Sequence, residues 1–286
     1  MKIGFRIPGA AREMAFDELC AWAKNAGFDA IDVGLVTDEI YSATAAAALE
    51  IGTSDLPGTR DLLSEDAEKR AAGALAAREA IQAAADRGVS RMFCVFMPDE
   101  VTRKRAETFR LWEEHFPPIA EFAAERGVTI AMEGWPGPGP YYPSIGCTPE
   151  TWRVMFAACP AGLGLNYDPS HLVRLGIDWA RALDEFGDKV VHVHGKDTRF
   201  DAERLYEHGQ LPPTFRSSKG FSESWWRYTI PGDGLVDWKQ CIQTLEDFGF
   251  DGIVSVELED HYYSQGWPAQ SEGLKRSRDF LATVIR

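Results

Sequence analysis

Four segments of the chain end a short apolar run with side chains that could do acid, base or metal chemistry. VTIAME ends in Glu133, LGLNYD ends in Asp168, KVVHVHG carries His192 and His194, and GIVSVELE carries Glu257. Three carboxylates buried together would repel one another strongly unless a cation joined them. If the fold brings these four segments to one place, a divalent metal ion is the chemistry that resolves the conflict.

The stretch GLGLNYDPSHLVRLG, residues 162–176, adds His171 three positions after Asp168. An acid and a histidine at this spacing are common by chance and do not by themselves distinguish a metal ligand from a turn. The other residues also have ordinary explanations, such as a loop acid for Glu133, a core histidine for His192 and a surface acid for Glu257. Their occurrence in four successive segments, at similar positions, argues against coincidence.

The elements that must position these residues alternate along the chain. Short apolar runs are followed by segments of helical period, which is typical of a parallel sheet covered by helices. Outer helices are expected over segments such as 60–87, 101–126 and 235–248, and DEIYSATAAAA predicts only a short, alanine-rich helix. We expect eight strands, over residues 2–7, 28–34, 49–55, 89–96, 128–133, 163–168, 189–195 and 252–259.

Eight such units predict a (β/α)8 TIM barrel, with residues 1–286 as a single domain, because about 250 residues suffice for this fold. An open doubly wound sheet usually has fewer strands and often carries a glycine-rich phosphate turn after the first, which is absent here. Barrel enzymes place their chemistry at the C-terminal ends of the strands. The acids and histidines above would therefore share one mouth of the barrel.

The connection after the seventh strand, residues 198–234, is far longer than the ~2 to 6 residues usual in such units. A loop of this length at the catalytic face is often a lid or a substrate wall. Its Trp225, Trp226 and Arg227 could cap a sugar-like ligand. The alternative is that the loop packs on the barrel or on a neighbouring subunit, and the sequence leaves both open.

The net charge of −14 argues against a nucleic-acid partner, because such partners are held mainly by lysine and arginine. The five cysteines are scattered without a C-x-x-C pair, so neither a disulfide framework nor a cysteine zinc site is expected. The start, MKIGFRIPGA, lacks a signal-peptide pattern, and no apolar run approaches the ~20 residues of a membrane span. We expect a cytoplasmic protein without a membrane partner.

Five motifs in the same order carry a family resemblance over essentially the whole chain: AMEGWPG, NYDPSHL, VHVHGKD, PGDGLVDW and DGIVSVELED. With them the chain resembles the sugar phosphate isomerase/epimerase family with the xylose isomerase-like TIM barrel (the AP endonuclease 2 superfamily). This group includes ketose 3-epimerases, hydroxypyruvate isomerase, inosose-processing enzymes and endonuclease IV. The endonuclease branch needs several zinc ions and extra histidines after strands three and four, where this chain has GTSDL and FCVFMPD. DNA repair is therefore disfavoured.

The resemblance assigns roles to individual residues. It implies that His171 contacts a substrate oxygen and that Arg199 is a substrate-binding arginine, at a spacing one residue shorter than in ketose 3-epimerases. We expect Trp135 and Asp197 to contact the substrate as well, and His192 to lie one layer below the metal in a supporting or core position. The implied metal ligands are Glu133, Asp168, His194 and Glu257, with Glu133 and Glu257 also forming the proton-transfer pair.

Three oxygen ligands and one nitrogen suit one divalent ion, Mn²⁺, Mg²⁺ or Co²⁺ best, with Zn²⁺ also compatible. The leading hypothesis is a metal-dependent isomerase or epimerase of a ketose or related polyol ketone. The metal would chelate the carbonyl and a neighbouring hydroxyl and stabilise an enediolate, while one glutamate removes a proton and the other returns it.

Two other functions remain open at this point. The enediolate could expel a leaving group, which would make the protein a lyase of a 3-keto-glycoside or a dehydratase of a keto-inositol. A sugar-binding barrel without catalysis is the third hypothesis. The expected partner in each case is a small sugar or polyol, and association into homo-oligomers is compatible with the family.

Overall fold

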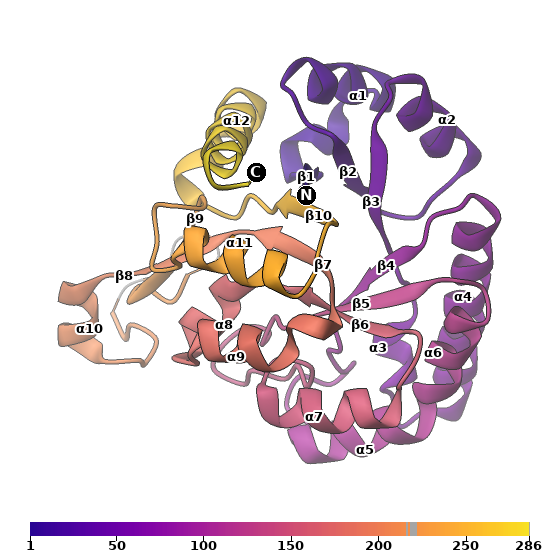
Figure 1. Cartoon of the computed structure of the whole chain (residues 1–286). Coiled ribbons are helices and arrows are strands. Elements are labelled where there is room, and N and C mark those ends of the chain that lie inside the picture. The colour runs from indigo at the N-terminus through magenta and orange to yellow at the C-terminus, as the bar shows by residue number, and fades with distance from the viewer. Residues whose placement is uncertain (216, 218–221, 286) are drawn as a thin grey trace.

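Eight parallel strands close into a barrel at the centre of the chain (Figure 1). The structure is a computed structural model that describes residues 1–215, 217 and 222–285. Around the barrel the strands follow the order β1, β10, β7, β6, β5, β4, β3 and β2. Their bounds are β1 Lys2–Arg6, β2 Ala30–Val33, β3 Glu50–Asp55, β4 Arg91–Cys94, β5 Thr129–Glu133, β6 Leu163–Tyr167, β7 Val190–Gly195 and β10 Ile253–Val256. The predicted TIM barrel and all eight of its strands are confirmed.

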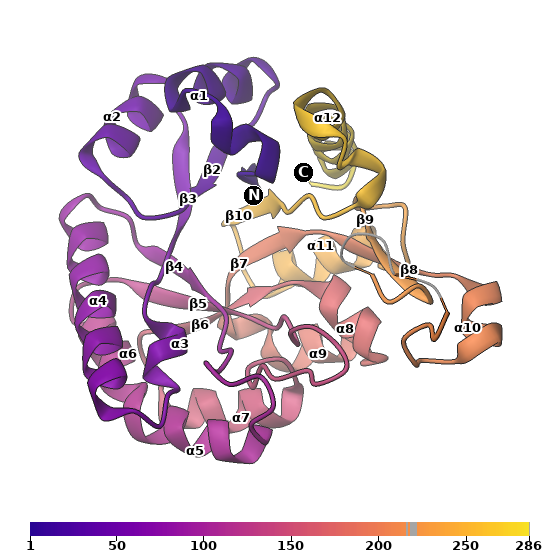
Figure 2. The same ribbon diagram turned by 180° about the vertical axis from the view of Figure 1, so that it is seen from behind.

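Helices surround the barrel on its outside (Figures 1 and 2). They are α1 Phe16–Asn25, α2 Asp38–Ala46, α3 Thr59–Leu62, α4 Ala67–Asp86, α5 Arg105–His115, α6 Pro117–Ala124, α7 Pro149–Ala158, α8 Pro169–Leu175, α9 Trp179–Phe186, α11 Trp238–Asp247 and α12 Gly266–Val284. Short 3-10 turns, η1 Gly9–Glu13, η2 Gly187–Lys189 and η3 His261–Tyr263, complete this layer. Among the described residues, no helix is both long and apolar enough to cross a membrane.

Two predicted helices are each divided in the structure. The segment 60–87 forms α3 and α4, because the side chain of Asp66 accepts hydrogen bonds from the N–H groups of Glu68 and Lys69 and begins a new helix there. The segment 101–126 divides at Pro117, which begins α6 and has no N–H to continue α5. Neither break moves the ends of the strands, so the site is unaffected.

Aromatic side chains fill the space between the barrel and its helices. Trp112 of α5 stacks on Phe116 at 5.4 Å and meets Phe96 edge-on at 5.8 Å, while Trp152 of α7 packs edge-on against Phe186 of α9 at 5.3 Å. Such pairs add to the hydrophobic burial of the rings themselves. The strands are held from outside, which fixes where each one ends at the mouth.

The long connection after β7 contains regular structure. β8 Asp197–Phe200 and β9 Trp226–Thr229 pair as an antiparallel ribbon, with the helix α10 Ala202–His208 between them. Trp225 and Trp226 are only 4% and 2% exposed and form a small hydrophobic cluster with Tyr228 and Phe200. Of the two alternatives for this segment, the described residues show packing on the molecule rather than a cap over a ligand; residues 216 and 218–221 lie outside the description.

Candidate metal and active site

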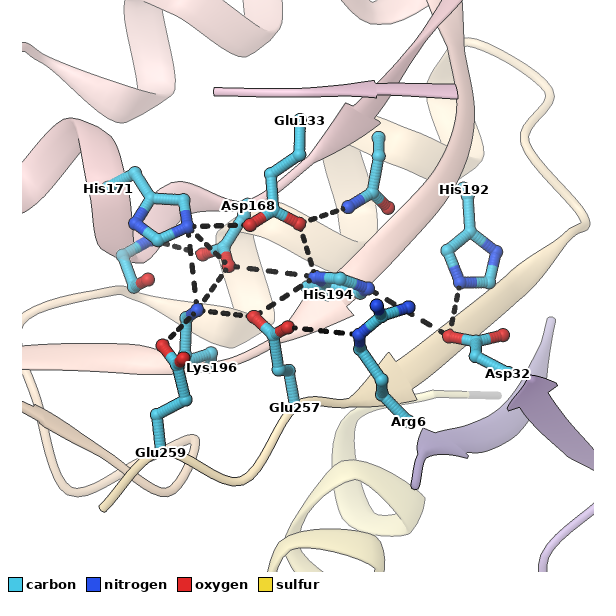
Figure 3. Close-up of polar contacts among 12 residues, drawn as sticks. Arg6, Asp32, Glu133, Asp168, His171, His192, His194, Lys196, Glu257 and Glu259 are labelled. Atoms are coloured by element: carbon cyan, nitrogen blue, oxygen red, sulfur yellow. Dashed lines mark hydrogen bonds and ion pairs between the residues drawn. The ribbon is translucent and has the colours of Figure 1, made fainter. Parts of the chain in front are cut away.

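The predicted acids and one histidine meet at the C-terminal mouth of the barrel (Figure 3). Glu133 is the last residue of β5, Asp168 directly follows β6, His194 lies near the end of β7, and Glu257 directly follows β10. The side chains of Glu133, Asp168 and His194 are at most 4% exposed, and that of Glu257 is 13% exposed. We call these four residues, three carboxylates and the imidazole of His194, the carboxylate cluster.

Glu133 is held by contacts on both of its oxygens. Its Oε2 accepts a hydrogen bond of 2.7 Å from Nδ2 of Asn166 and lies 2.6 Å from Nδ1 of His194. Its Oε1 lies 2.8 Å from Nε2 of His171. The carboxylate therefore has a single orientation, facing the other members of the cluster.

The Asp168-to-His171 spacing is explained by α8, which begins at Pro169. Asp168 is the N-cap of this helix, and its Oδ1 accepts a hydrogen bond of 2.9 Å from the N–H of Ser170. Its Oδ2 points the other way and lies 3.4 Å from Nε2 of His171 and 3.9 Å from Nδ1 of His194. One carboxylate thus caps a helix with one oxygen and presents the other to the cluster.

The residues of the cluster fit a divalent metal. Oδ2 of Asp168 and Nδ1 of His194 are buried, and neither has a hydrogen-bond partner of acceptable geometry among the described residues. Each atom instead faces a charged group: Nζ of Lys196 is 3.2 Å from Oδ2 of Asp168, and Oε2 of Glu133 is 2.6 Å from Nδ1 of His194, so both atoms point into the cluster where an ion would bind. Ligand atoms of Glu133, Asp168, His171 and Glu257 lie within 4.8 Å of one another, so His171 is an alternative nitrogen donor. His194 forms a second group of this kind, with Asp32 and His192.

The ionisation of the cluster follows from its neighbours. Burial and Glu257 raise the pKa of Glu133, but His194 and His171 outweigh them and hold it below the ordinary range. Burial lowers the pKa of His194, but Glu257 and Glu133 raise it well above 6.5. Burial raises the pKa of Glu257, but Lys196 and His194 bring it well below 4.5. Without a metal, Glu133 and Glu257 are ionised and are balanced by the imidazolium of His194 and the ammonium of Lys196.

Lys196 is a member of the site to which the sequence assigned no role. Its Nζ contacts Glu257 and lies 2.9 Å from Oε2 of Glu259 and 3.2 Å from Oδ2 of Asp168. The ammonium is fully buried and lies over the ring of Tyr228 at 4.5 Å. Burial lowers its pKa, but the three carboxylates raise it well above 10.5, so Lys196 stays charged.

A cavity of about 240 Å³ opens beside the cluster, on the side of β1, β3 and β4. Its lining includes Arg6, Asp55, Phe93 and Trp135, so the expected substrate contact Trp135 lies in its wall. Nε of Arg6 is 3.5 Å from Oε1 of Glu257, and its guanidinium lies over the ring of Phe93 at 4.2 Å. Arg6, at the end of β1, was missed by sequence reasoning.

Tyr228 of β9 orients His171. Its hydroxyl lies 2.7 Å from Nδ1 of His171 and accepts a hydrogen bond of 3.1 Å from the guanidinium of Arg174. Since Nδ1 is occupied in this way, Nε2 of His171 is directed at Glu133. The ribbon therefore supports the site through the contact between Tyr228 and His171, and no sequence pattern predicts this contact.

Asp197 and Arg199 are not brought to the cluster. The carboxylate of Asp197 is buried and accepts hydrogen bonds from backbone N–H groups in the segment 232–236 and from Nε1 of Trp238. Arg199 is exposed on the ribbon opposite Arg227. Both residues lie away from the cluster because β8, which begins directly after Lys196, belongs to the separate sheet with β9 and not to the barrel. Substrate contact by Asp197 or Arg199 stays a prediction that the geometry does not support.

Comparisons with known proteins agree with this arrangement. The family model described as xylose isomerase-like TIM barrel matches residues 20–284. Over 141 residues the chain is 30% identical to the inosose dehydratase of Geobacillus thermodenitrificans (strain NG80-2), a match that covers 49% of this chain and 44% of that relative. The chain thus matches less than half the length of this curated relative.

Solved structures resemble the whole chain. A D-psicose 3-epimerase from Clostridium cellulolyticum H10 has a TM-score of 0.74 and 14% identity, with 100% of both chains covered. The 3-keto-D-glucoside 4-epimerase YcjR of E. coli has a TM-score of 0.68 and 17% identity, with 99% of both chains covered. At these identities the likeness establishes the fold.

Proposed function

The chain belongs to the family of xylose isomerase-like TIM barrels, and we infer from its relatives that it is a sugar-processing enzyme. On this premise we propose that it is a divalent-metal-dependent isomerase or epimerase of a ketose or a related polyol ketone. The reaction is the removal of a proton next to the carbonyl and its return at another face or at the neighbouring carbon.

One observation carries this proposal: two glutamates from different strands approach the same atom. Glu133 at the end of β5 and Glu257 after β10 lie 2.6 Å and 3.3 Å from Nδ1 of His194. A pair of carboxylates placed on two sides of a bound substrate provides one base and one acid. Return of the proton from the opposite face gives epimerisation, and return to the adjacent carbon gives isomerisation.

The metal would be held by Glu133, Asp168, His194 and Glu257, with His171 close enough to contribute. A bound divalent ion supplies Lewis acidity, which stabilises negative charge developing on the substrate oxygen as the proton leaves. The predominance of oxygen donors favours Mn²⁺, Mg²⁺ or Co²⁺ over softer ions. Since Glu133 and Glu257 are already ionised, these two glutamates need no further proton loss to serve either as ligands or as a base.

The cavity beside Glu257 favours a small substrate. Its volume of about 240 Å³ is below the ~300–1,000 Å³ typical of pockets for drug-sized ligands. Arg6 supplies hydrogen-bond donors for hydroxyl or carbonyl oxygens, while Phe93 and Trp135 offer apolar faces for the carbon skeleton. These properties suit the oxygen atoms and the carbon skeleton of a ketose or inosose.

A second candidate is dehydration of a keto-inositol, or elimination of an alcohol from a 3-keto-glycoside. Lys196 favours it, because an ammonium beside Glu257 and 3.4 Å from Nε2 of His171 could donate a proton to a leaving oxygen. The curated relative named inosose dehydratase supports the same branch. The two candidates share the first step and differ in whether the intermediate is reprotonated or loses a substituent.

Proton NMR in D₂O distinguishes the candidates directly. The protein is loaded with Mn²⁺, desalted, and incubated with free ketoses, keto-inositols and 3-keto-glucosides. Deuterium next to the carbonyl in a product that keeps all of its substituents identifies an isomerase or epimerase. Loss of water or of an aglycone identifies the elimination. A loaded protein that exchanges no proton of any of these ketones would refute both.

A further inference from the structure

A second group of ionisable side chains lies below the carboxylate cluster, inside the barrel. Asp32 of β2 faces His192 and His194 of β7, and all three side chains are inaccessible to solvent. Oδ2 of Asp32 lies 3.0 Å from Nε2 of His192 and 3.8 Å from Nε2 of His194 (Figure 3). Among the described residues no lysine or arginine is within ion-pair distance of Asp32, so the two histidines are its only partners of that kind.

The strand β3 fixes the direction of this carboxylate. The N–H of Thr53 donates a hydrogen bond of 3.0 Å to Oδ1 of Asp32. The neighbouring residue is Gly52, and a Cβ atom there would lie 2.2 Å from the same Oδ1, so any larger residue would displace the carboxylate. With Oδ1 held against β3, Oδ2 is the oxygen presented to the histidines across the barrel.

His194 joins this buried group to the carboxylate cluster. One of its ring nitrogens, Nδ1, faces Glu133 and Glu257, while the other, Nε2, faces Asp32. If Nδ1 binds a metal, the proton of the neutral imidazole must be on Nε2. Asp32 is the carboxylate on that side, and a carboxylate behind a metal-binding histidine fixes its tautomer and ring orientation.

His192 also contacts Asp32 and helps to hold its carboxylate in place. It lies two residues before His194 on β7, so both rings are on the same face of the strand. The rings meet edge-on, with centroids 5.8 Å apart and an interplanar angle of 81°. Because its Nε2 shares Oδ2 of Asp32, His192 restricts rotation of the carboxylate beneath His194.

We propose that Asp32 is a positioning residue for the metal centre, which holds the ring of His194 so that Nδ1 is presented to the ion. This inference rests on the proposed function, because it requires a metal at Nδ1. Ligand atoms of Asp32, His192 and His194 also lie close enough together to hold an ion. Such an ion cannot readily be bound at the same time as one at Nδ1, since His194 would then have to give up both of its ring protons.

The test is the affinity of the metal-free protein for Mn²⁺, measured by competition with a chelator. Asp32→Asn preserves the size of the side chain and removes its charge, and it should weaken Mn²⁺ binding by roughly 10- to 100-fold. The visible absorption spectrum of the Co²⁺-loaded variant should also shift, because the geometry at His194 changes. A purely structural role for Asp32 would alter thermal stability and leave both of these readouts unchanged.

Two further variants complete the experiment. Asp260→Asn is the matched control: Asp260 is 4% exposed and pairs with Arg227 at 2.9 Å, outside the cluster, so its loss should leave Mn²⁺ affinity unchanged. Gly52→Ala displaces the carboxylate of Asp32 without removing it and should weaken Mn²⁺ binding, which serves as the test if Asp32→Asn does not fold.

The possible failures are distinguishable. If Asp32→Asn and Gly52→Ala both bind Mn²⁺ within threefold of the wild type, and the Co²⁺ spectra are unchanged, Asp32 does not position His194. If the wild-type protein itself binds neither Mn²⁺ nor Co²⁺, the proposed function is refuted, and the positioning role is refuted with it.

Discussion

Glu133 and Glu257 both contact His194, and each has two further side-chain partners of its own, which gives each carboxylate a fixed direction. Fixed direction is what a proton-transfer residue requires, since the proton must move over a hydrogen-bond distance. Asn166 and His171 hold the first glutamate, while Arg6 and Lys196 hold the second. Apart from the shared His194, the two glutamates are therefore supported by different neighbours, and each can be replaced in a separate variant.

Replacement of either glutamate by glutamine should nearly abolish turnover. Glu133→Gln and Glu257→Gln keep the shape of the side chain but lose the base, and such a loss typically costs about 10²–10⁴ in rate. The measurement is the initial rate of deuterium incorporation into the substrate identified by NMR. Glu185→Gln, at an exposed pair with Arg153, is the control and should turn over normally. Activity within tenfold of the wild type in either site variant would contradict the assignment.

Lys196 should matter for turnover and not for holding the metal. Lys196→Met keeps the length of the side chain and removes its charge from among Asp168, Glu257 and Glu259. Because the lost charge is positive, attraction of a divalent cation to the remaining carboxylates should not weaken. We expect turnover to fall by at least about tenfold, with a dissociation constant for Mn²⁺ equal to or lower than that of the wild type. Metal binding that weakens with turnover would instead make Lys196 a structural support of the ligands.

The sequence predicted the site residues at the ends of the barrel strands much better than the site residues that lie on other elements. Asp168 and Glu257 were found by asking what stands at the C-terminal ends of parallel strands, and the structure brings them together. Arg6 follows the same rule at the first strand and was overlooked because the end of that strand was not searched. Tyr228 reaches His171 through a tertiary contact across 57 positions, for which the sequence carries no local signal.

At the scale of elements, the ribbon of β8 and β9 is the main addition to the predicted barrel. Residues 198–234 were expected as a loop because their composition lacks a regular apolar period, and strand pairing over four residues is too short to show one. In the structure the ribbon places Tyr228 behind His171 and buries Trp225 and Trp226. Its function is to support the site, so changes in it should act on stability and on the orientation of His171.

Tyr228→Phe should reduce stability in a pH-dependent way. Burial raises the pKa of Tyr228 above its ordinary 10, so the fold favours the neutral phenol. This contribution is fully present below pH ~10 and is lost as pH rises through the folded pKa. The wild type should therefore be more stable than Tyr228→Phe at pH 8, by about 1 kcal/mol for the lost hydrogen bond. That advantage should narrow above pH 10.

Urea unfolding of the metal-free proteins at pH 8 and pH 10.5 measures this difference. Tyr206 is 88% exposed, so Tyr206→Phe should follow the wild type at both values and serves as the control. Since Tyr167 is present in every variant, its own titration cancels in the comparison. An advantage of the wild type that stays constant or grows with pH would show that Tyr228 is not kept neutral by burial.

At the scale of the molecule, closure of the barrel brings residues that are far apart in the chain into one site, and folding should therefore be coupled to binding of the proposed metal. β1 pairs with β10 to bring Arg6 beside Glu257, and β5 and β6 pair to bring Glu133 beside Asn166. The unfolded chain has no such site, so metal binding should favour the folded state. An ion at 100 times its dissociation constant would stabilise the fold by about 2.7 kcal/mol.

The variant Asp168→Asn distinguishes the stability that comes from metal binding from the stability of the metal-free fold. Asparagine caps a helix about as well as aspartate, so α8 should still begin at Pro169. The substitution also removes the ion pair with Lys196, so the unfolding temperature of each metal-free protein is the reference for its own shift. Saturating Mn²⁺ should raise the unfolding temperature of the wild type by on the order of 5 °C and that of Asp168→Asn much less. Differential scanning calorimetry with and without a chelator measures both shifts. Equal shifts in the two proteins would place the metal elsewhere than at Oδ2 of Asp168, because the variant differs from the wild type only there.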